Sequence, residues 1–162
     1  MARVARKPVG GLTAALLIPI GSVTTASIFS AHCTELAWRA DAHTVNCPLL
    51  DDRSSYREET VATGGLSMVR HTLTLMVSRE QGQLLFTQEW LATCATEGVI
   101  AQITAADGEM LLIGYSQHLG NEQPLRFKSL VTEIGKKRTD LPLSILTLYS
   151  EDTEPASTYD NQ

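Results

Sequence analysis

An alternation of side-chain types over residues 66–77 constrains the fold of this chain more than any other feature. The stretch reads LSMVRHTLTLMV, and its residues fall into two sets at intervals of two. One set is Leu66, Met68, Arg70, Thr72, Thr74 and Met76, and the other is Ser67, Val69, His71, Leu73, Leu75 and Val77. Because successive side chains of a strand point to opposite faces, the stretch predicts a strand whose second, more apolar set packs on a core. A single histidine in that set is typical of a partly buried structural residue rather than of a catalyst.

Shorter runs of apolar and β-branched residues predict further strands on both sides of this one. They cover residues 12–20, 23–30, 34–40, 56–65, 99–104, 110–116, 125–133 and 143–149. Asp107 and Gly108 lie between two of these runs, and an Asp-Gly pair favours a tight hairpin turn because it tolerates positive φ. Residues 46–55 contain Pro48 and paired aspartates and indicate a turn region.

One helix is predicted, over residues 79–96. Ser78 is its candidate N-cap, and Glu80 lies in its first turn beside the positive end of the helix dipole. Gly98 is its candidate C-terminal stop. The chain is therefore expected to be mainly β with one flanking α-helix, an α+β fold built as an antiparallel β-sandwich or barrel.

The chain of 162 residues has the length of one domain and divides into three regions. Residues 1–11 are basic and are expected to form an N-terminal arm. Residues 12–150 are expected to form a single β-sandwich domain. Residues 151–162 are expected to form a polar, acidic and exposed C-terminal tail.

The first 31 residues also have the outline of a secretory signal peptide, with a basic start, an apolar run and small residues near the end. The apolar run is short, contains Pro19 and is followed by a β-branched pattern that favours a strand. A helix that spans a membrane needs roughly 20 apolar residues, and the sequence contains no such run. We therefore favour a strand here and expect no membrane association.

The sequence carries none of the common catalytic motifs. It contains no P-loop, no GxGxxG, no GxSxG and no HExxH. Its paired acidic residues are neighbours in the chain, so in strands they point to opposite faces and are expected to be solvated. The formal net charge of −5 argues against a protein that coats DNA. We expect no enzymatic activity and no cofactor.

The three cysteines, Cys33, Cys47 and Cys94, are interpreted as small buried apolar thiols. Two alternatives remain open. One is a Cys33–Cys47 disulfide, and the other is a site that combines these two cysteines with His32 and His43. A zinc site usually needs about four ligands in close pairs, and this spacing does not supply them.

A basic run of Lys136, Lys137 and Arg138 lies between the last two predicted long strands. As a loop it is simply solvated, and as a nucleic-acid contact it lacks nearby aromatic residues for stacking. A third interpretation is a contact with the acidic residues of a neighbouring subunit, for which the candidates are Glu151, Asp152 and Glu154. Because exposed ion pairs are weak, such contacts would set the register of an assembly rather than its affinity.

Several segments resemble a group of small structural proteins that phages and prophages of Bacteroidetes encode. These segments are GLSMVRHTLTLMVSRE, GVIAQITAADGEMLLIGYS, GNEQPLRFKSLVTEIGKKRTDLP, LTLYSEDTEPA and the opening LIPIGSVTTASI. The motifs are strand and turn patterns and include no catalytic signature. The resemblance implies a virion component of the tail, with a fold similar to tail-tube subunits, in which a β-sandwich flanked by one helix forms hexameric rings.

This resemblance implies partners and a location as well as a fold. The partners would be copies of the chain and other phage tail proteins, with DNA passing transiently through the ring. The protein would be assembled in the cytoplasm of the host bacterium and would then reside in the virion. Arg70, Thr72 and Thr74 are the candidates to face the lumen, or Ser67 and Val69 if the register is reversed.

Two alternatives to a ring or tube of the tail stay open. The first is another ring of the virion, namely a tail terminator, a head–tail connector or a baseplate component. The second is an exported bacterial β-domain that binds a ligand or a partner.

Overall fold

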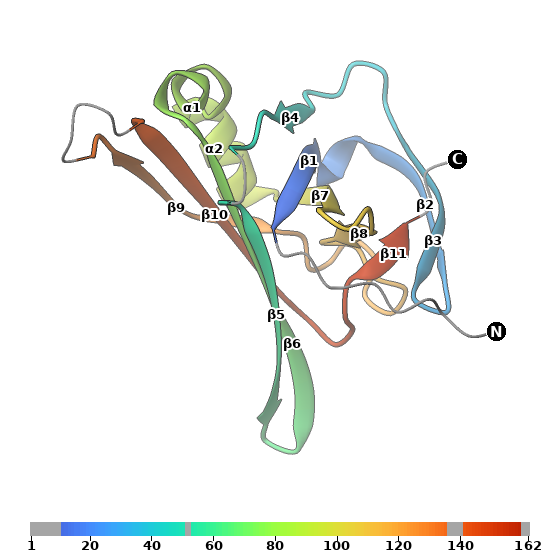
Figure 1. Ribbon diagram of the computed structural model, residues 1–162. Helices are drawn as coiled ribbons and strands as arrows, with labels where there is room; N and C mark the ends of the chain where they lie inside the picture. Colours follow the sequence, from blue (N-terminus) through green and yellow to red (C-terminus); the bar gives the residue numbers. More distant parts are fainter. Residues whose placement is uncertain (1–10, 51–52, 136–140, 160–162) are drawn as a thin grey trace.

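Two β-sheets packed against each other form most of the protein (Figure 1), in a computed structural model that describes residues 11–50, 53–135 and 141–159. Sheet A has seven strands in the order β2-β3-β11-β8-β7-β1-β4, and sheet B has four strands in the order β5-β6-β10-β9. The expected mainly β architecture with helical structure at its side is confirmed. In chain order, the strands are β1 Leu12–Pro19, β2 Val23–Phe29, β3 His32–Trp38, β4 Val45–Cys47, β5 Ser55–Thr63, β6 Leu66–Ser78, β7 Val99–Ala105, β8 Met110–Ile113, β9 Arg126–Glu133, β10 Leu143–Asp152 and β11 Ser157–Tyr159.

The alternation predicted over residues 66–77 is confirmed in β6. Val69, Leu73, Leu75 and Val77 are all 3% exposed or less, and the last three belong to the main core, together with residues of sheet A. Burial of each such side chain stabilises the fold by about 1.5–3 kcal/mol relative to an exposed position. Arg70 and the threonines of β6 lie on the opposite face. The register of this strand is therefore the expected one, and the reversed register, with Val69 on the outside, is wrong.

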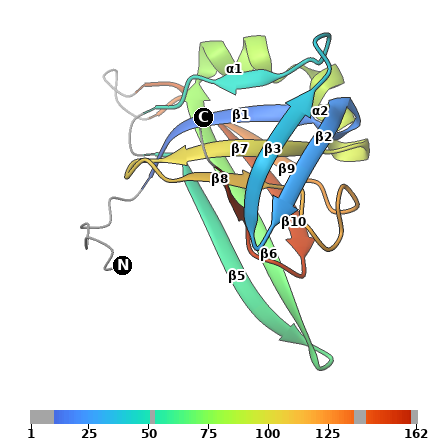
Figure 2. The ribbon, with the colours of Figure 1, turned by 90° about the vertical axis from the view of Figure 1, so that its right-hand side faces the viewer.

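The apolar run at the start of the chain forms β1, whose second half is buried on both of its faces. Leu17 packs in the main core, whereas Ile18 joins a second, smaller core with Ile100, Cys33 and Leu112. The β2–β3 hairpin covers this second core (Figure 2). A strand with cores on both sides has no polar face, which is why the run lacks alternation.

The predicted helix of residues 79–96 is two helices, α1 Arg79–Leu85 and α2 Gln88–Thr96. Ser78 caps α1 as expected, because its hydroxyl accepts a hydrogen bond from the Gln81 N–H at 3.3 Å. The break follows from a second cap, since the Thr87 hydroxyl accepts from the Trp90 N–H at 3.2 Å. Phe86 leaves the helical conformation at this break and stacks on Trp90 in the core, with ring centroids 5.5 Å apart.

The C-terminal region is not the exposed tail that the sequence predicts. β10 continues to Asp152, and after a short crossover Ser157–Tyr159 forms β11 inside sheet A. β11 pairs in parallel with β3 on one side and in antiparallel with β8 on the other. The C-terminal segment therefore connects sheet B to sheet A and joins the β2–β3 hairpin to the rest of sheet A. The turn region predicted over residues 46–55 overlaps at Asn46 and Cys47 with an unexpected strand, β4, which pairs with β1.

The hairpin of β5 and β6 projects beyond the two-sheet body (Figure 1). Its turn consists of Gly64 and Gly65, both with positive φ (57° and 85°), as a two-residue hairpin turn requires. Leu66 beside the turn is 70% exposed. Val69 is the first fully buried residue of β6, so the outer part of the hairpin makes no contribution to the core.

Gly82 lets α1 lie directly on β10, and its replacement by alanine should destabilise the protein. A Cβ atom at this position would lie 2.3 Å from the Ser144 hydroxyl oxygen and 2.5 Å from the Ser144 Cβ. We expect Gly82→Ala to lower the free energy of unfolding by about 1–3 kcal/mol, although alanine favours helices. Urea denaturation tests this, with the exposed neighbour Gln83→Ala as the control, expected to change stability by about 0.5 kcal/mol or less. A stability gain in Gly82→Ala would show that α1 does not contact β10 in this way.

Candidate assembly interface

Sheet B ends in two long strands, and each of them pairs on one side only. β5 pairs with β6, and β9 pairs with β10; within the described residues neither strand has a second partner. β5 is nine residues long and β9 is eight. Unpaired N–H and C=O groups along such an edge are a template for another strand, so both edges are candidate contact surfaces.

The outer face of sheet B is polar and carries charges of both signs. Arg70, Thr72 and Thr74, the residues predicted to line a lumen, lie on this face. Arg70 lies 3.7 Å from Glu151 of β10, and Arg57 lies 3.7 Å from Glu59 along β5. Because these side chains remain substantially exposed, their ion pairs are weak and screened by salt. The face is thus polar and hydrated, with positive and negative charges paired along it.

Exposed apolar side chains gather at one end of the β9 edge. Val131 on β9 is 45% exposed, Ile134 just beyond the strand is 61% exposed, and Leu141 before β10 is 52% exposed. Val131 lies opposite Ile145 in the register of β9 with β10, so it belongs to the outer face of the sheet. This end of β9 therefore offers both unpaired backbone and apolar surface to a partner.

The three acidic residues predicted to contact a neighbouring subunit do not share one surface. Lys136, Lys137 and Arg138 lie outside the described residues. Glu151 lies on the outer face of sheet B, where it also accepts a hydrogen bond from Tyr149. Asp152 is 4% exposed and accepts from the Thr153 N–H at 2.6 Å, so its carboxylate is largely withdrawn from the surface. Glu154 lies in the crossover to β11, where its backbone carbonyl contacts His71.

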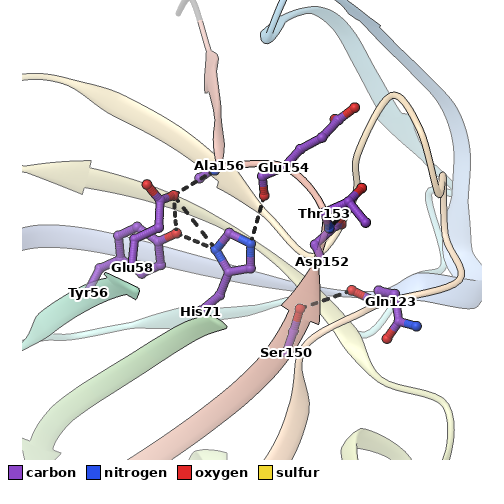
Figure 3. A network of polar contacts seen from close by, with 9 residues as sticks. All are labelled: Tyr56, Glu58, His71, Gln123, Ser150, Asp152, Thr153, Glu154 and Ala156. Carbon is purple, nitrogen blue, oxygen red and sulfur yellow. Dashed lines mark hydrogen bonds and ion pairs between the residues drawn. The ribbon is translucent and has the colours of Figure 1, made fainter. Parts of the chain in front are cut away.

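A buried polar cluster lies on the inner face of sheet B, where the crossover leaves β10 (Figure 3). His71 is 3% exposed, and its Nδ1 lies 2.5 Å from the Tyr56 hydroxyl while its Nε2 lies 3.1 Å from the Glu154 carbonyl oxygen. The Tyr56 hydroxyl also lies 2.8 Å from Glu58 Oε1, which accepts from the Ala156 N–H at 2.7 Å. Burial lowers the pKa of His71. Three nearby groups act in the opposite direction and raise it: the charge of Glu58, the backbone carbonyl of Glu154 and the charge of Asp152.

Sequence reasoning placed His71 in the interior but did not identify its partners. A signal for one of them exists, because the two-residue turn of Gly64 and Gly65 fixes the register of the hairpin and sets Glu58 opposite His71. Tyr56 lies two residues before Glu58 and so shares its face. The contacts with Glu154 and Ala156 depend on the path of the crossover, for which the sequence has no local signal.

The cysteines are buried free thiols, as predicted. Burial raises the pKa of Cys47 and of Cys94 to about 12 and also raises the pKa of Cys33, so the reactive thiolate forms are disfavoured. Cys33 lies in the second core and Cys47 in the main core, which separates the two candidates for a disulfide. Within the ranges that the structure describes, no group of three or more His, Cys, Asp or Glu side chains is placed to hold a metal ion.

Comparison with models of known protein families found no match, and comparison with curated proteins found none either. Neither helix in the described part of the chain is long and apolar enough to cross a membrane. The function proposed below therefore rests on the geometry of the two sheets.

Loss of the Tyr56 hydroxyl should destabilise the protein, because His71 Nδ1 would then be buried without its partner. We expect Tyr56→Phe to lower the free energy of unfolding by about 1–3 kcal/mol. The matched control is Tyr149→Phe on the outer face of the same sheet, with an expected loss of about 0.5 kcal/mol or less. Urea denaturation of both variants at neutral pH measures the difference. Equal losses would mean that the inner cluster has no special energetic role.

Proposed function

We propose that this protein is a structural protein of a bacteriophage tail, which assembles through the edges of sheet B into rings or a tube. The observation that carries the proposal is the pair of unpaired edges, β5 and β9, on opposite sides of one sheet. The resemblance of the segments quoted above to phage tail proteins supports the same conclusion. The architecture of two sheets with helices at the side is compatible with a tail-tube type of fold.

The strand directions in sheet B suit closure of a ring. Its four strands pair in antiparallel fashion throughout, so β5 and β9, at the two edges, run in opposite directions. A second copy rotated about an axis roughly parallel to the strands keeps its own strand directions. Its β5 then runs antiparallel to the β9 of the first copy, and repeated rotation yields one continuous antiparallel barrel. A hexamer is the stoichiometry that the family resemblance implies.

The faces of sheet B then acquire distinct environments. The inner face packs on the core of each subunit, and the outer face with Arg70, Thr72 and Thr74 would line the lumen. That face carries paired charges of both signs, so passing DNA would meet no continuous cationic track to which it could bind. The projecting β5–β6 hairpin would extend the wall of the lumen along the axis of the ring.

The contact between two subunits must offset the free-energy cost of association. Pairing along β9 would add about eight backbone hydrogen bonds, each worth about 0.5–1.5 kcal/mol net. Association costs about 4–15 kcal/mol in lost freedom of motion, so the backbone bonds alone roughly balance this cost. Apolar burial around Val131, Ile134 and Leu141 would then supply the net affinity.

The assembly state of the full chain tests this function. Sedimentation velocity and negative-stain electron microscopy at rising protein concentration should show rings or tubes. A protein that remains monomeric at high concentration would contradict the proposal and favour the alternative of a β-domain that binds a ligand or partner. Rings that never stack into tubes would favour a terminator, connector or baseplate ring.

A lysine at the β9 edge should prevent assembly without unfolding the subunit. Val131→Lys places a charge on an exposed edge position, the same means by which natural edge strands avoid pairing. We expect each subunit contact to weaken by at least about 1 kcal/mol, and rings to give way to monomers. The matched control is Leu84→Lys on α1, where the leucine is 67% exposed and belongs to neither edge strand. Rings that persist in Val131→Lys, or that are lost equally in Leu84→Lys, would exclude the β9 edge as the contact.

A further inference from the structure

We propose that the hollow beside β2 binds a neutral saccharide, with Phe29 as the ring against which the sugar packs. This β2 hollow has a volume of about 320 Å³, within the range of about 300–1,000 Å³ that is usual for small-molecule sites. It is lined by residues 26–29 of β2, Thr34 of β3, and residues 115–117 and Gly120 of the loop after β8. None of these elements belongs to sheet B, so the inference goes beyond the proposed function and does not depend on it.

Two segments that lie far apart in the sequence form the walls of the β2 hollow. One wall is the β2–β3 hairpin at the edge of sheet A (Figure 2), and the other is the loop after β8. Backbone hydrogen bonds close this loop in both directions, from the Gly120 N–H to the Ser116 carbonyl at 2.8 Å and from the Ser116 N–H to the Gly120 carbonyl at 3.2 Å. Walls that are already ordered lower the entropic cost of binding a ligand.

Phe29 supplies an aromatic surface at the mouth of the β2 hollow. Among the described residues, no large apolar side chain is more exposed than Phe29, at 73%. The turn that follows it is fixed in place, because the Ala31 carbonyl accepts a hydrogen bond from the Thr158 N–H of β11 at 3.0 Å. A ligand that covers this ring removes apolar surface from water without having to order the strand that carries it.

The polar groups of the β2 hollow are neutral and free to bind a ligand. Among the described residues, no hydrogen-bond partner is found for the Ser27 hydroxyl, the Tyr115 hydroxyl or the Gln117 side-chain amide. Hydroxyl and amide groups both donate and accept hydrogen bonds. The residues that line the hollow include no charged side chain.

A saccharide has the chemistry that complements this combination. One face of a pyranose ring carries weakly positive C–H groups, which pack on the electron-rich face of an aromatic ring. The hydroxyls around the sugar both donate and accept, so they match neutral hydroxyl and amide groups. A phosphate, sulfate or carboxylate on the ligand would find no cation among the lining residues. A neutral sugar is therefore favoured over an acidic one.

An added β-strand is the main competing occupant, because β2 is an edge strand of sheet A. The pairing of β2 with β3 is irregular at two places, between Val23 and Thr25 and between Ser27 and Ile28. Irregularities of this kind twist an edge and oppose the addition of a further strand. The second one lies within the hollow, where an added strand would have to pair. A compact ligand needs no regular ladder of backbone hydrogen bonds.

A ring of subunits would repeat the β2 hollow on its surface, and this consequence alone rests on the proposed function. With the outer face of sheet B toward the lumen, sheet A lies on the side of each subunit away from the lumen. Several weak sites on one ring would then bind a single polysaccharide chain with avidity.

Saturation-transfer difference NMR of the full-length protein tests the site. The probes are maltose, lactose, cellobiose and chitobiose, each raised to about 20 mM because a single open site is expected to bind weakly. The method observes the sugar, so it works for a monomer and for a ring, and its result is separate from that of the assembly test. We expect saturable binding of at least one probe. Absence of binding for all four, or tighter binding of glucuronate or adenosine than of any of them, would overturn the proposal.

Substitutions of Phe29 show whether the bound sugar occupies the β2 hollow. Phe29→Ala and Phe29→Leu should each weaken binding by about tenfold, since leucine restores apolar area without an aromatic face, and Phe29→Trp should keep it. The matched control is Leu66→Ala at the tip of the β5–β6 hairpin, where the leucine is 70% exposed and binding should not change. Full binding in Phe29→Leu, or equal loss in Leu66→Ala, would contradict the site.

A variant in the other wall keeps the proposal testable if changes at Phe29 disturb the hairpin. Gln117→Ala removes neutral hydrogen-bonding groups from the loop after β8 and should weaken binding by about two- to tenfold. Unchanged affinity in Gln117→Ala together with unchanged affinity in Phe29→Ala would place the sugar elsewhere and overturn the proposal.

Discussion

The backbone along β5 and β9, which has no second partner strand among the described residues, is the constraint on which the proposed role depends. A strand edge leaves its N–H and C=O groups to water or to another chain, and long edges in natural proteins are shortened, covered or charged. Neither edge of sheet B is short. The strands do carry charge, including Arg57 and Glu59 on β5 and Arg126 and Lys128 on β9. These charges favour solubility of the free subunit, and they leave the edges able to pair once a partner arrives in the correct register.

Sheet A differs from sheet B in where its strands come from in the sequence. The chain returns at its C-terminus to insert β11 between β3 and β8, so the sheet is completed by a segment from the far end of the sequence. Its own edges are β2 and the three-residue β4. Sheet A thus has one long edge, the seven-residue β2, whereas both edges of sheet B are long. The crossover between the sheets runs through the cluster of Tyr56, Glu58 and His71, and the stability of the connection depends on that cluster.

Local patterns predicted most of the strands, because strand periodicity and turn chemistry are local properties. The alternation of β6, the Asp107-Gly108 turn and the Ser78 cap are each read within a few residues. The helix break was missed, although Thr87 followed by Trp90 in the core has the form of a second N-cap. The functional prediction came from a family resemblance and from strand character, and the structure adds which edges are unpaired.

The sequence does not predict pairing between strands that lie far apart along the chain. β11 has three polar or aromatic residues, and its partners on β3 lie more than 100 positions earlier, as the His32–Thr158 contact at a separation of 126 shows. No local period marks such a strand, so the sequence predicts an acidic tail in this region. Asp152 was interpreted as a surface charge for the same reason, although the end of β10 buries it. The polar cluster depends on the same crossover. Of its contacts, the sequence predicts only the pairing of Glu58 with His71.

A cryo-electron microscopy reconstruction of the assembled protein, at a resolution that separates strands, tests the central claim most directly. The account predicts that β9 of each subunit runs antiparallel to β5 of the next, with Arg70, Thr72 and Thr74 facing a central lumen. An assembly in which both of these edges remain in contact with solvent, or in which that face of sheet B points away from the axis, would contradict it.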